Sequence, residues 1–288
     1  MRAARGRSTA WKLQLIVTMN LPDPRVTAVC GLYPEALTRL SESGVPFLIG
    51  GAYALERYTG IARDTKDLDV FLRQRDVEGA LVALSDIGCR TEVTFPHWLA
   101  KAVTAEGVID LIYSAGNGIA VVDDGWFDHG VDADVFGVPV KLCPPEETIW
   151  SKAFIMERER FDGADVAHIL RSCAPNLDWR RLLRRFGPHW RVLLSHLVLF
   201  GFIYPGERWR IPPDVLRDLT ARVASESAGP APDERVCQGT VLSRAQYLPD
   251  IDKWGYRDAR ASLGIMSPED IARWTDAIED HEPPRAAA

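Results

Sequence analysis

Two aspartates one residue apart, Asp67 and Asp69, follow a short apolar segment that ends in two glycines. Successive side chains of a strand point to opposite faces, so Asp67 and Asp69 share one face while Leu68 and Val70 share the other. Two carboxylates held this close repel each other, and a divalent cation between them is the usual reason to keep both. Hard oxygen ligands select Mg²⁺ or Mn²⁺. The spacing therefore predicts a magnesium or manganese site.

The two glycines, Gly50 and Gly51, close the apolar run from Val45 to Ile49, which is typical of a buried strand. A helix is expected to begin near Ala52. Backbone N–H groups at the start of such a helix suit a phosphate. The glycines could also simply end the strand, but the acid pair that follows favours contact with a nucleotide triphosphate.

A third carboxylate, Asp110, lies in the middle of the apolar segment from Val108 to Tyr113. An acid in such a strand is costly unless it is paired or bound to metal. Three acids on two neighbouring strands can hold two ions, and two ions can activate a hydroxyl and stabilise a pyrophosphate leaving group. The alternative is a surface strand with solvated acids, which the apolar neighbours of Asp110 argue against.

This pattern resembles the nucleotidyltransferase superfamily of the polymerase-beta kind, and within it the minimal or AbiEii-like nucleotidyltransferase branch. The resemblance covers roughly Val45 to Arg171. Its points of contact are listed in chain order: Gly50-Gly51, Arg63-x-Thr65-x-Asp67-x-Asp69, Asp110, Lys152 and Arg160-Phe161-Asp162-Gly-Ala-Asp165. Phe161 stands where that branch often has a lysine, and Gly51 stands where it often has a serine.

The resemblance implies the transfer of a nucleoside monophosphate from an NTP to a hydroxyl, with release of pyrophosphate. Asp67 and Asp69 would hold Mg²⁺ or Mn²⁺, and Asp110 would complete the metal site and help to deprotonate the acceptor. Gly50 and Gly51 would seat the phosphates of the NTP. The implied acceptor is open between tRNA, a protein and a small molecule. ATP as the donor, a toxin–antitoxin-like role with a cognate antitoxin-like partner, and a cytoplasmic location are further expectations.

The residues that flank the acids have two interpretations each. Arg63, Thr65 and Lys66 could counter the charge of the triphosphate or only that of the aspartates. Lys152 lies at the edge of the apolar face of a helix expected over residues 145–160, where it could reach phosphate or extend into solvent. Asp165 follows Asp162 at the spacing of a helix cap, and the resemblance also brings Asp165 near the site.

The composition is that of a soluble globular protein that does not coat nucleic acid. The 288 residues are 47% hydrophobic and 26% charged, with a net charge of −6. The five cysteines are scattered and show no zinc-site spacing, which suggests reduced thiols in a cytosol. No apolar run is long enough for a transmembrane helix, so no membrane association is expected.

The fold expected is α/β (α+β), with a small mixed-sheet nucleotidyltransferase domain followed by an α-helical domain and the site in the cleft between them. The expected organisation is a flexible extension over 1–30, the catalytic domain over 31–143, the helical domain over 144–226, and a linker, aromatic segment and final helix over 227–288. In the catalytic domain we expect helices over 34–42, 52–58 and 76–87 and strands over 45–49, 68–72, 90–94, 99–104, 108–113 and 138–142. In the helical domain we expect helices over 145–160, 163–173, 178–186, 189–204 and 213–225, and a last helix begins at Pro268.

Two further segments have open roles. The arginines from Arg180 to Arg191 form a basic stripe that is either a solvated helix face or a contact for an RNA acceptor. The segment from Gln238 to Arg260 is either a lid over the acceptor or packing against the catalytic domain. Two other functions compete with nucleotidyl transfer: a catalytically silent nucleotide-binding scaffold, and a phosphoester hydrolase that uses the same metals.

Overall fold

The computed structural model describes residues 31–231 and 233–277. The extension expected over 1–30 and the end of the chain from 278 lie outside the described residues. Within the described part of the chain, no helix is both long and apolar enough to cross a bilayer.

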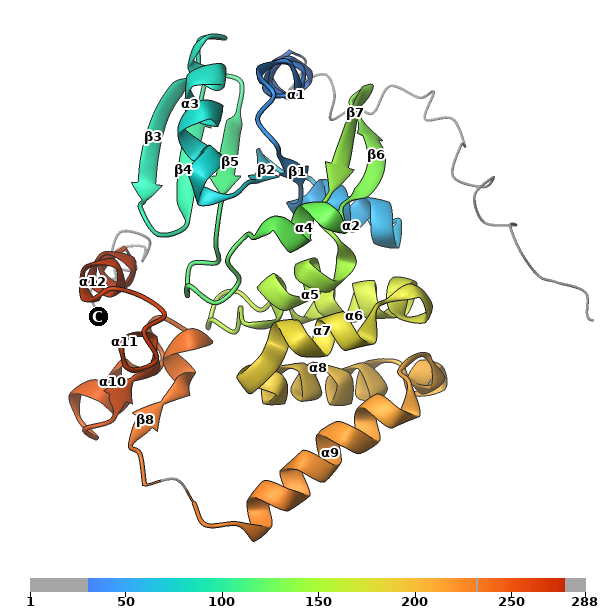
Figure 1. Cartoon of the computed structure of the whole chain (residues 1–288), viewed down its shortest axis with the longest axis vertical. Coiled ribbons are helices and arrows are strands. Elements are labelled where there is room, and N and C mark those ends of the chain that lie inside the picture. Colours follow the sequence, from blue (N-terminus) through green and yellow to red (C-terminus); the bar gives the residue numbers. More distant parts are fainter. Residues whose placement is uncertain (1–30, 232, 278–288) are drawn as a thin grey trace, which may run out of the picture.

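A mixed seven-stranded sheet forms the upper half of the molecule in Figure 1, with strand order β3-β4-β5-β2-β1-β7-β6. Its strands are β1 (Leu48–Ile49), β2 (Asp67–Phe71), β3 (Arg90–Phe95), β4 (Leu99–Val103), β5 (Val108–Ile112), β6 (Val131–Val135) and β7 (Val138–Leu142). The β2–β5 and β1–β7 pairs are parallel, and the other pairs are antiparallel. The mixed sheet expected from the sequence is confirmed.

Helices α1 (Leu32–Ser43) and α3 (Val77–Ser85) cover one face of this sheet. Their apolar side chains form one buried cluster with Leu68, Val70, Ile109 and Leu111, the residues that alternate with the three acids along β2 and β5. The period of two in these strands therefore sends the apolar residues to the α1–α3 side and the acids to the other side.

A second buried cluster holds the helices that follow the sheet, seen below it in Figure 1. These are α5 (Pro145–Ala153), α6 (Gly163–Cys173), α7 (Trp179–Phe186), α8 (Trp190–Ile203) and α9 (Pro213–Ala228). Leu48 of β1 and Leu55 of α2 (Gly51–Thr59) belong to this cluster. The sheet and the helices thus share packing, and the domain boundary at residue 143 stays a prediction.

The helix predicted over 145–160 is wrong beyond Ala153, where α5 ends. The chain then forms a short hairpin in which Glu157 N donates to Arg160 O at 2.9 Å. The side chain of Glu157 accepts a hydrogen bond from Arg244 N at 3.1 Å and another from the Ser243 hydroxyl. These bonds to a distant part of the chain stabilise the hairpin and favour it relative to a continuation of the helix. Helix α4 (Asp124–Asp128) and strand β6 were not predicted.

The C-terminal segment packs against the end of the β3–β4 hairpin. It contains β8 (Val236–Cys237), α10 (Leu248–Asp252), β9 (Arg257–Asp258), α11 (Ala259–Ser262) and α12 (Pro268–Asp276). The ring of Trp274 lies 5.0 Å from that of Phe95 and 5.2 Å from that of Trp98, centroid to centroid. Asn117 Nδ2 donates to Val241 O at 2.7 Å. The hydrogen bond to Val241 supports the packing interpretation of residues 238–260, and the lid interpretation stays a prediction.

Two arginines of the basic stripe, Arg181 and Arg185, are drawn into ion pairs with other parts of the fold, whereas Arg180, Arg184 and Arg191 are exposed. Arg181 is 8% exposed and forms ion pairs with Glu146 and Glu147, two buried residues of the first turn of α5. Arg185 binds Glu147 at 2.9 Å and Asp123 at 2.5 Å. The interpretation of Arg181 and Arg185 as surface contacts for RNA is therefore wrong. Buried glutamates, which the sequence pattern did not connect to α7, need these two arginines as counter-ions.

Removal of one of these arginines tests that account. Arg181→Met should lower the free energy of unfolding by about 3–5 kcal/mol, because Glu146 is left as a buried charge without its counter-ion. Arg184→Met, at an exposed position one helical turn along, is the matched control and should change it by less than about 0.5 kcal/mol. Chemical denaturation measures both. Equal effects of the two substitutions would contradict a structural role for Arg181.

Candidate active site

The three predicted acids converge on one face of the sheet. Asp67 and Asp69 lie on β2, and Asp110 lies on the adjacent parallel strand β5 with its Cα directly opposite that of Asp69. All three side chains are half-buried, on the face away from α1 and α3. The alternation expected from the sequence thus places these carboxylates together, while their role as metal ligands stays a prediction.

The pKa of Asp69 responds both to its burial and to the charges of the other two carboxylates. Burial, followed by the negative charges of Asp67 and Asp110, raises the pKa of Asp69 to about 6. Lys152 and Arg160 oppose this rise in the pKa of Asp69, so these two cations lie near it. Residues of the helical part of the chain therefore act on the acids of the sheet, at the junction that was expected to hold the site.

Two of the three acids already have a partner of their own. The Thr65 hydroxyl donates to a carboxylate oxygen of Asp67. Lys101 Nζ lies 2.7 Å from Asp110 Oδ1, and burial still raises the pKa of Asp110 above its ordinary value. Among the described residues, no three His, Cys, Asp or Glu side chains form a closed group around a metal-sized space. Asp67 and Asp69 nevertheless supply the oxygen donors that suit Mg²⁺ or Mn²⁺.

The two glycines start helix α2 against these acids. Gly51 has φ +54°, and a Cβ on it would lie 1.7 Å from Asp69 Oδ2. A Cβ on Gly50 would lie 2.3 Å from the ring of Phe71. A side chain at Gly51 would therefore collide with the Asp69 carboxylate. Gly50 N donates to Asp69 O at 3.0 Å, so the N–H groups available to a phosphate begin at Gly51.

A network of five charged side chains lies next to the acids. Lys152 Nζ is 2.8 Å from both Asp162 Oδ2 and Asp165 Oδ2. Arg63 binds Asp165 at 2.5 Å, and Arg160 binds Asp162 at 3.0 Å. The network joins the segment before β2 to α5, to the hairpin after it and to α6. Lys152 is only 15% exposed, so the alternative that it extends into solvent is wrong.

The helix-cap interpretation of Asp162 is confirmed for its position and wrong for its side chain. Asp162 is the N-cap residue of α6, but its carboxylate makes no hydrogen bond to the helix backbone and binds Lys152 and Arg160 instead. A carboxylate with two cationic partners within reach gains more from these charge-assisted bonds than from a cap.

Of the remaining predicted residues, Thr65 contacts the acids and Lys66 does not. Thr65 lies beside Asp67, as described above, whereas the side chain of Lys66 is exposed and only its carbonyl is bound, by Tyr33 Oη at 3.0 Å. Sequence reasoning missed Lys101. A single lysine within the apolar strand Leu-Ala-Lys-Ala-Val is the signal that could have found it.

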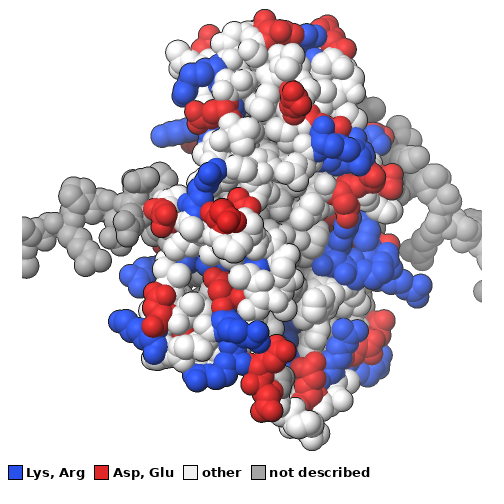
Figure 2. Space-filling view, turned by 60° about the vertical axis from the view of Figure 1, so that its left-hand side comes forward, with Lys and Arg blue, Asp and Glu red and all other residues white. Residues whose placement is uncertain are grey.

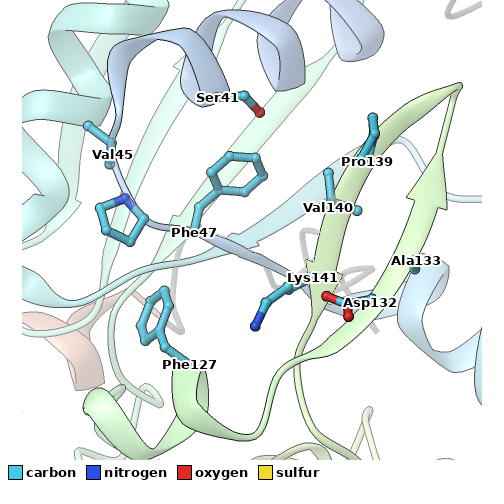
Figure 3. A pocket seen from close by; sticks show the side chains of 10 residues that line it. Ser41, Val45, Phe47, Phe127, Asp132, Ala133, Pro139, Val140 and Lys141 are labelled. Carbon is cyan, nitrogen blue, oxygen red and sulfur yellow. The ribbon is translucent and has the colours of Figure 1, made fainter.

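A groove of about 560 Å³ lies elsewhere, between the end of α1 and the β6–β7 hairpin. Figure 3 shows Phe47, Phe127 and Val140 lining it, with Asp132 and Lys141 from neighbouring strands of the hairpin. None of the predicted site residues lines this groove. The groove is therefore separate from the candidate site at the acids.

The close approach of Gly51 to Asp69 can be tested against Gly60, the glycine at the other end of α2. Gly60 has φ +73° but open space around it, so Gly60→Ala should cost only the left-handed strain, about 1–2 kcal/mol. Gly51→Ala should cost clearly more, because its Cβ also displaces the Asp69 carboxylate. Chemical denaturation compares the two. An equal loss of unfolding free energy would mean that the clash is relieved at no cost.

The raised pKa of Asp69 predicts a pH-dependent gain from Asp69→Asn in the metal-free protein. A pKa raised from 3.8 to about 6 means that the native state binds the proton more tightly than the unfolded state. The resulting stabilisation is present below pH 3.8 and is lost as the pH rises through 6. Asn mimics the protonated acid, so the variant should match the wild type at pH 4 and exceed it by about 1–3 kcal/mol at pH 8. Denaturation in EDTA measures the difference, and a gain that does not depend on pH would refute this origin.

Comparison with known proteins gives weak structural likenesses. The antibiotic-resistance factor ANT(2'')-Ia is 17% identical over 71% of this chain and 95% of its own, with a TM-score of 0.35. The lincosamide antibiotic adenylyltransferase LnuA is 14% identical over 46% and 90%, with a TM-score of 0.34. An antigenic nucleotidyltransferase-like protein from Paracoccidioides brasiliensis is 16% identical over 65% and 92%, with a TM-score of 0.39. At these scores the likenesses carry no argument about function. No curated protein matches the chain.

A protein-family model matches residues 31–183, more than half of the chain. The matched span contains the predicted site residues, from the glycines at the start of α2 through the acids of β2 and β5 to the charged network of α5 and α6. The chain belongs to the family described as "Nucleotidyl transferase of unknown function (DUF2204)".

Proposed function

We propose that this protein transfers a nucleoside monophosphate from an NTP to a hydroxyl of an acceptor, releases pyrophosphate, and needs Mg²⁺ or Mn²⁺ to do so. The observation that carries the proposal is the meeting of three carboxylates with the glycine-rich start of α2: Asp69 lies opposite Asp110 and in contact range of Gly51. Anionic metal ligands and free helix N–H groups are the two features that a metal-bound triphosphate requires.

Asp67 and Asp69 are the residues that would hold the divalent ion. They lie on one face of β2, and no ion pair within the described part of the chain involves either of them. A bound Mg²⁺ or Mn²⁺ would supply positive charge for the phosphate oxygens and for the leaving group. The cost of keeping Asp69 ionised, visible in its raised pKa, is removed when a cation binds beside it.

The charged network next to the acids would bind the triphosphate. Its three cations are Arg63, Lys152 and Arg160, and the two carboxylates that bind them are Asp162 and Asp165. Arg160 is 63% exposed and can turn toward a ligand, whereas Lys152 is held between its two partners. We therefore assign Lys152 and Asp165 to the positioning of this cationic face, with Arg63 and Arg160 as its contacts to phosphate.

Asp110 would accept the proton of the acceptor hydroxyl. In that step the hydroxyl O–H bond breaks and its proton passes to the carboxylate. The hydroxyl oxygen forms a bond to the α-phosphorus, and the bond between this phosphorus and the bridging oxygen breaks. Pyrophosphate leaves with that electron pair. The N–H groups at the start of α2 stabilise the charge that develops on the phosphates.

The proposed acceptor is a small molecule or a protein rather than tRNA. The basic stripe that favoured RNA loses Arg181 and Arg185 to buried ion pairs. Acidic and basic side chains are interspersed over the face of the molecule that Figure 2 shows, where a nucleic acid would favour a continuous basic surface. The AbiEii-like branch, an antitoxin-like partner, ATP as the donor and a cytoplasmic location stay predictions from the resemblance.

The two competing functions make different use of the same acids. A catalytically silent scaffold has no need for three neighbouring carboxylates, one of which has its pKa raised to about 6 by burial and by the charges of the other two. A phosphoester hydrolase would use the acids but would not attach a nucleotide to an acceptor. The products therefore separate nucleotidyl transfer from hydrolysis.

The experiment incubates the protein with each α-³²P-labelled NTP, Mg²⁺ or Mn²⁺, and a total cell extract. We expect the label to appear on an acceptor together with pyrophosphate, and no transfer when the NTP is labelled at the γ-phosphate. Asp67→Asn and Asp69→Asn should each reduce transfer by at least about 10³-fold, because phosphoryl transfer depends on electrostatic stabilisation at the phosphates. Asp132→Asn removes an exposed acid of β6 in the same sheet and should leave transfer unchanged.

Three results would count against the proposal. Transfer retained in both aspartate variants would exclude them as metal ligands. Release of free nucleotide without any labelled acceptor would favour the hydrolase. No consumption of any NTP would favour the scaffold.

A further inference from the structure

The three acids of the site differ in the partners that the fold gives them. Asp67 accepts a hydrogen bond from the neutral hydroxyl of Thr65, and Asp69 lies against the start of α2. Asp110 alone is bound directly to a cation, because Lys101 Nζ lies 2.7 Å from its Oδ1. The described part of the chain contains no ion pair to Asp67 or Asp69, so this asymmetry belongs to the site itself.

The pair between Lys101 and Asp110 is built into the sheet. Strand β4 runs antiparallel to β5, and the Cα of Lys101 lies directly opposite that of Asp110. Both side chains therefore leave the sheet on the same face, the one that also carries Asp69. Lys101 is the single charged residue of β4, with buried alanines on either side. The register of two paired strands, and not a chance contact of flexible chains, places the ammonium on the carboxylate.

The surroundings of this pair make it persistent. The side chains of Asp110 and Lys101 are 14% and 28% exposed, so solvent screens their charges only in part. Hydrogen bonds between two charged groups are stronger where solvent has limited access to them. A divalent ion that used Asp110 as a ligand would have to displace the ammonium or share a carboxylate with it at close range, and two cations at that distance repel each other.

We infer that Lys101 is the resident counter-ion of Asp110 and keeps this carboxylate out of the metal site before nucleotide binds. The inference rests on the proposed function. It divides the three acids between two tasks: Asp67 and Asp69 bind the ion, and Asp110 is reserved for the proton of the acceptor. Lys101 is thus a positioning residue, because it acts through Asp110. The absence of a closed three-acid group among the described residues agrees with this division.

The division also determines which oxygen of Asp110 takes the proton. Oδ1 is bound by the ammonium of Lys101, which leaves Oδ2 for the acceptor hydroxyl. The O–H bond of the acceptor breaks, its proton moves to Oδ2, and the electron pair of that bond forms the new bond to the α-phosphorus. The pyrophosphate carries away the electron pair of the bond that breaks. Lys101 keeps its three protons throughout and only orients the carboxylate.

The test measures Mn²⁺ binding without nucleotide, by titration with detection of free Mn²⁺ by electron paramagnetic resonance. Lys101→Met should tighten Mn²⁺ binding by about tenfold, because a third carboxylate becomes available and a nearby positive charge is removed. Lys101→Gln is a second variant with the same expectation. Lys101→Arg keeps the charge and should bind Mn²⁺ as the wild type does.

The double variant Lys101→Met/Asp110→Asn separates the guarding of Asp110 from a general effect of charge. If Lys101 guards Asp110, the gain in affinity should vanish in the double variant, to within about threefold of the wild type. A gain that persists without Asp110 would come from the lost charge alone and would overturn the inference. Lys101→Met and Lys101→Gln variants that bind no more tightly than the wild type would overturn it as well.

Lys141→Met is the matched control. Lys141 lies on β7 directly opposite Asp132 of β6 in the register of the same sheet, and β1 separates β7 from the strand that carries Asp67 and Asp69. Its Mn²⁺ affinity should equal that of the wild type. Failure of the proposed function gives a different result: if the wild type binds no Mn²⁺ and Asp67→Asn changes nothing, the metal site itself is refuted. Normal binding by the wild type without the gain in Lys101→Met refutes the role of Lys101 alone.

Discussion

The burial of the Asp69 carboxylate beside two other carboxylates is the constraint on which the rest of the site depends. Asp69 lies between Asp67 on its own strand and Asp110 on the next, and its pKa rises to about 6 through burial and these two charges. The three carboxylates cannot turn to the other face of the sheet, because the apolar side chains of α1 and α3 fill it. On the remaining side the start of α2 comes so close that Gly51 has no room for a Cβ. In the proposed function, a bound cation would offset this accumulation of negative charge.

The helical part of the chain and the segment before β2 place a network of charged side chains next to these acids. Lys152, Arg63 and Arg160 approach the acids, and Asp162 and Asp165 hold them in place. The shared hydrophobic packing, in which Leu48 and Leu55 join the helical cluster, keeps the two halves in register. The chain belongs to a family of nucleotidyl transferases, and the matched region contains this arrangement. A cationic face beside an acidic one is what a metal-bound triphosphate needs, and each half of the molecule supplies one.

The acids, the glycines and the mixed sheet could be predicted because each follows from a local pattern. Alternation along β2 places Asp67 and Asp69 on one face, and Asp110 stands out in an apolar strand. The residues that were missed or misinterpreted depend on contacts between distant segments. Lys101 reaches Asp110 only through the β4–β5 register, Arg181 is buried only because α5 brings two glutamates to it, and the helix after Lys152 ends because Glu157 binds the C-terminal segment. No periodicity in the sequence reports such pairings.

Thermal unfolding with and without an NTP and Mn²⁺ tests the central claim most directly, since it needs no knowledge of the acceptor. If the acids and the start of α2 bind a metal–triphosphate complex, NTP and Mn²⁺ together should stabilise the wild type by about 3 kcal/mol at a hundredfold excess over Kd. Asp69→Asn should show no such rise relative to its own ligand-free state. An unchanged melting temperature of the wild type, or an equal rise in the variant, would contradict the account.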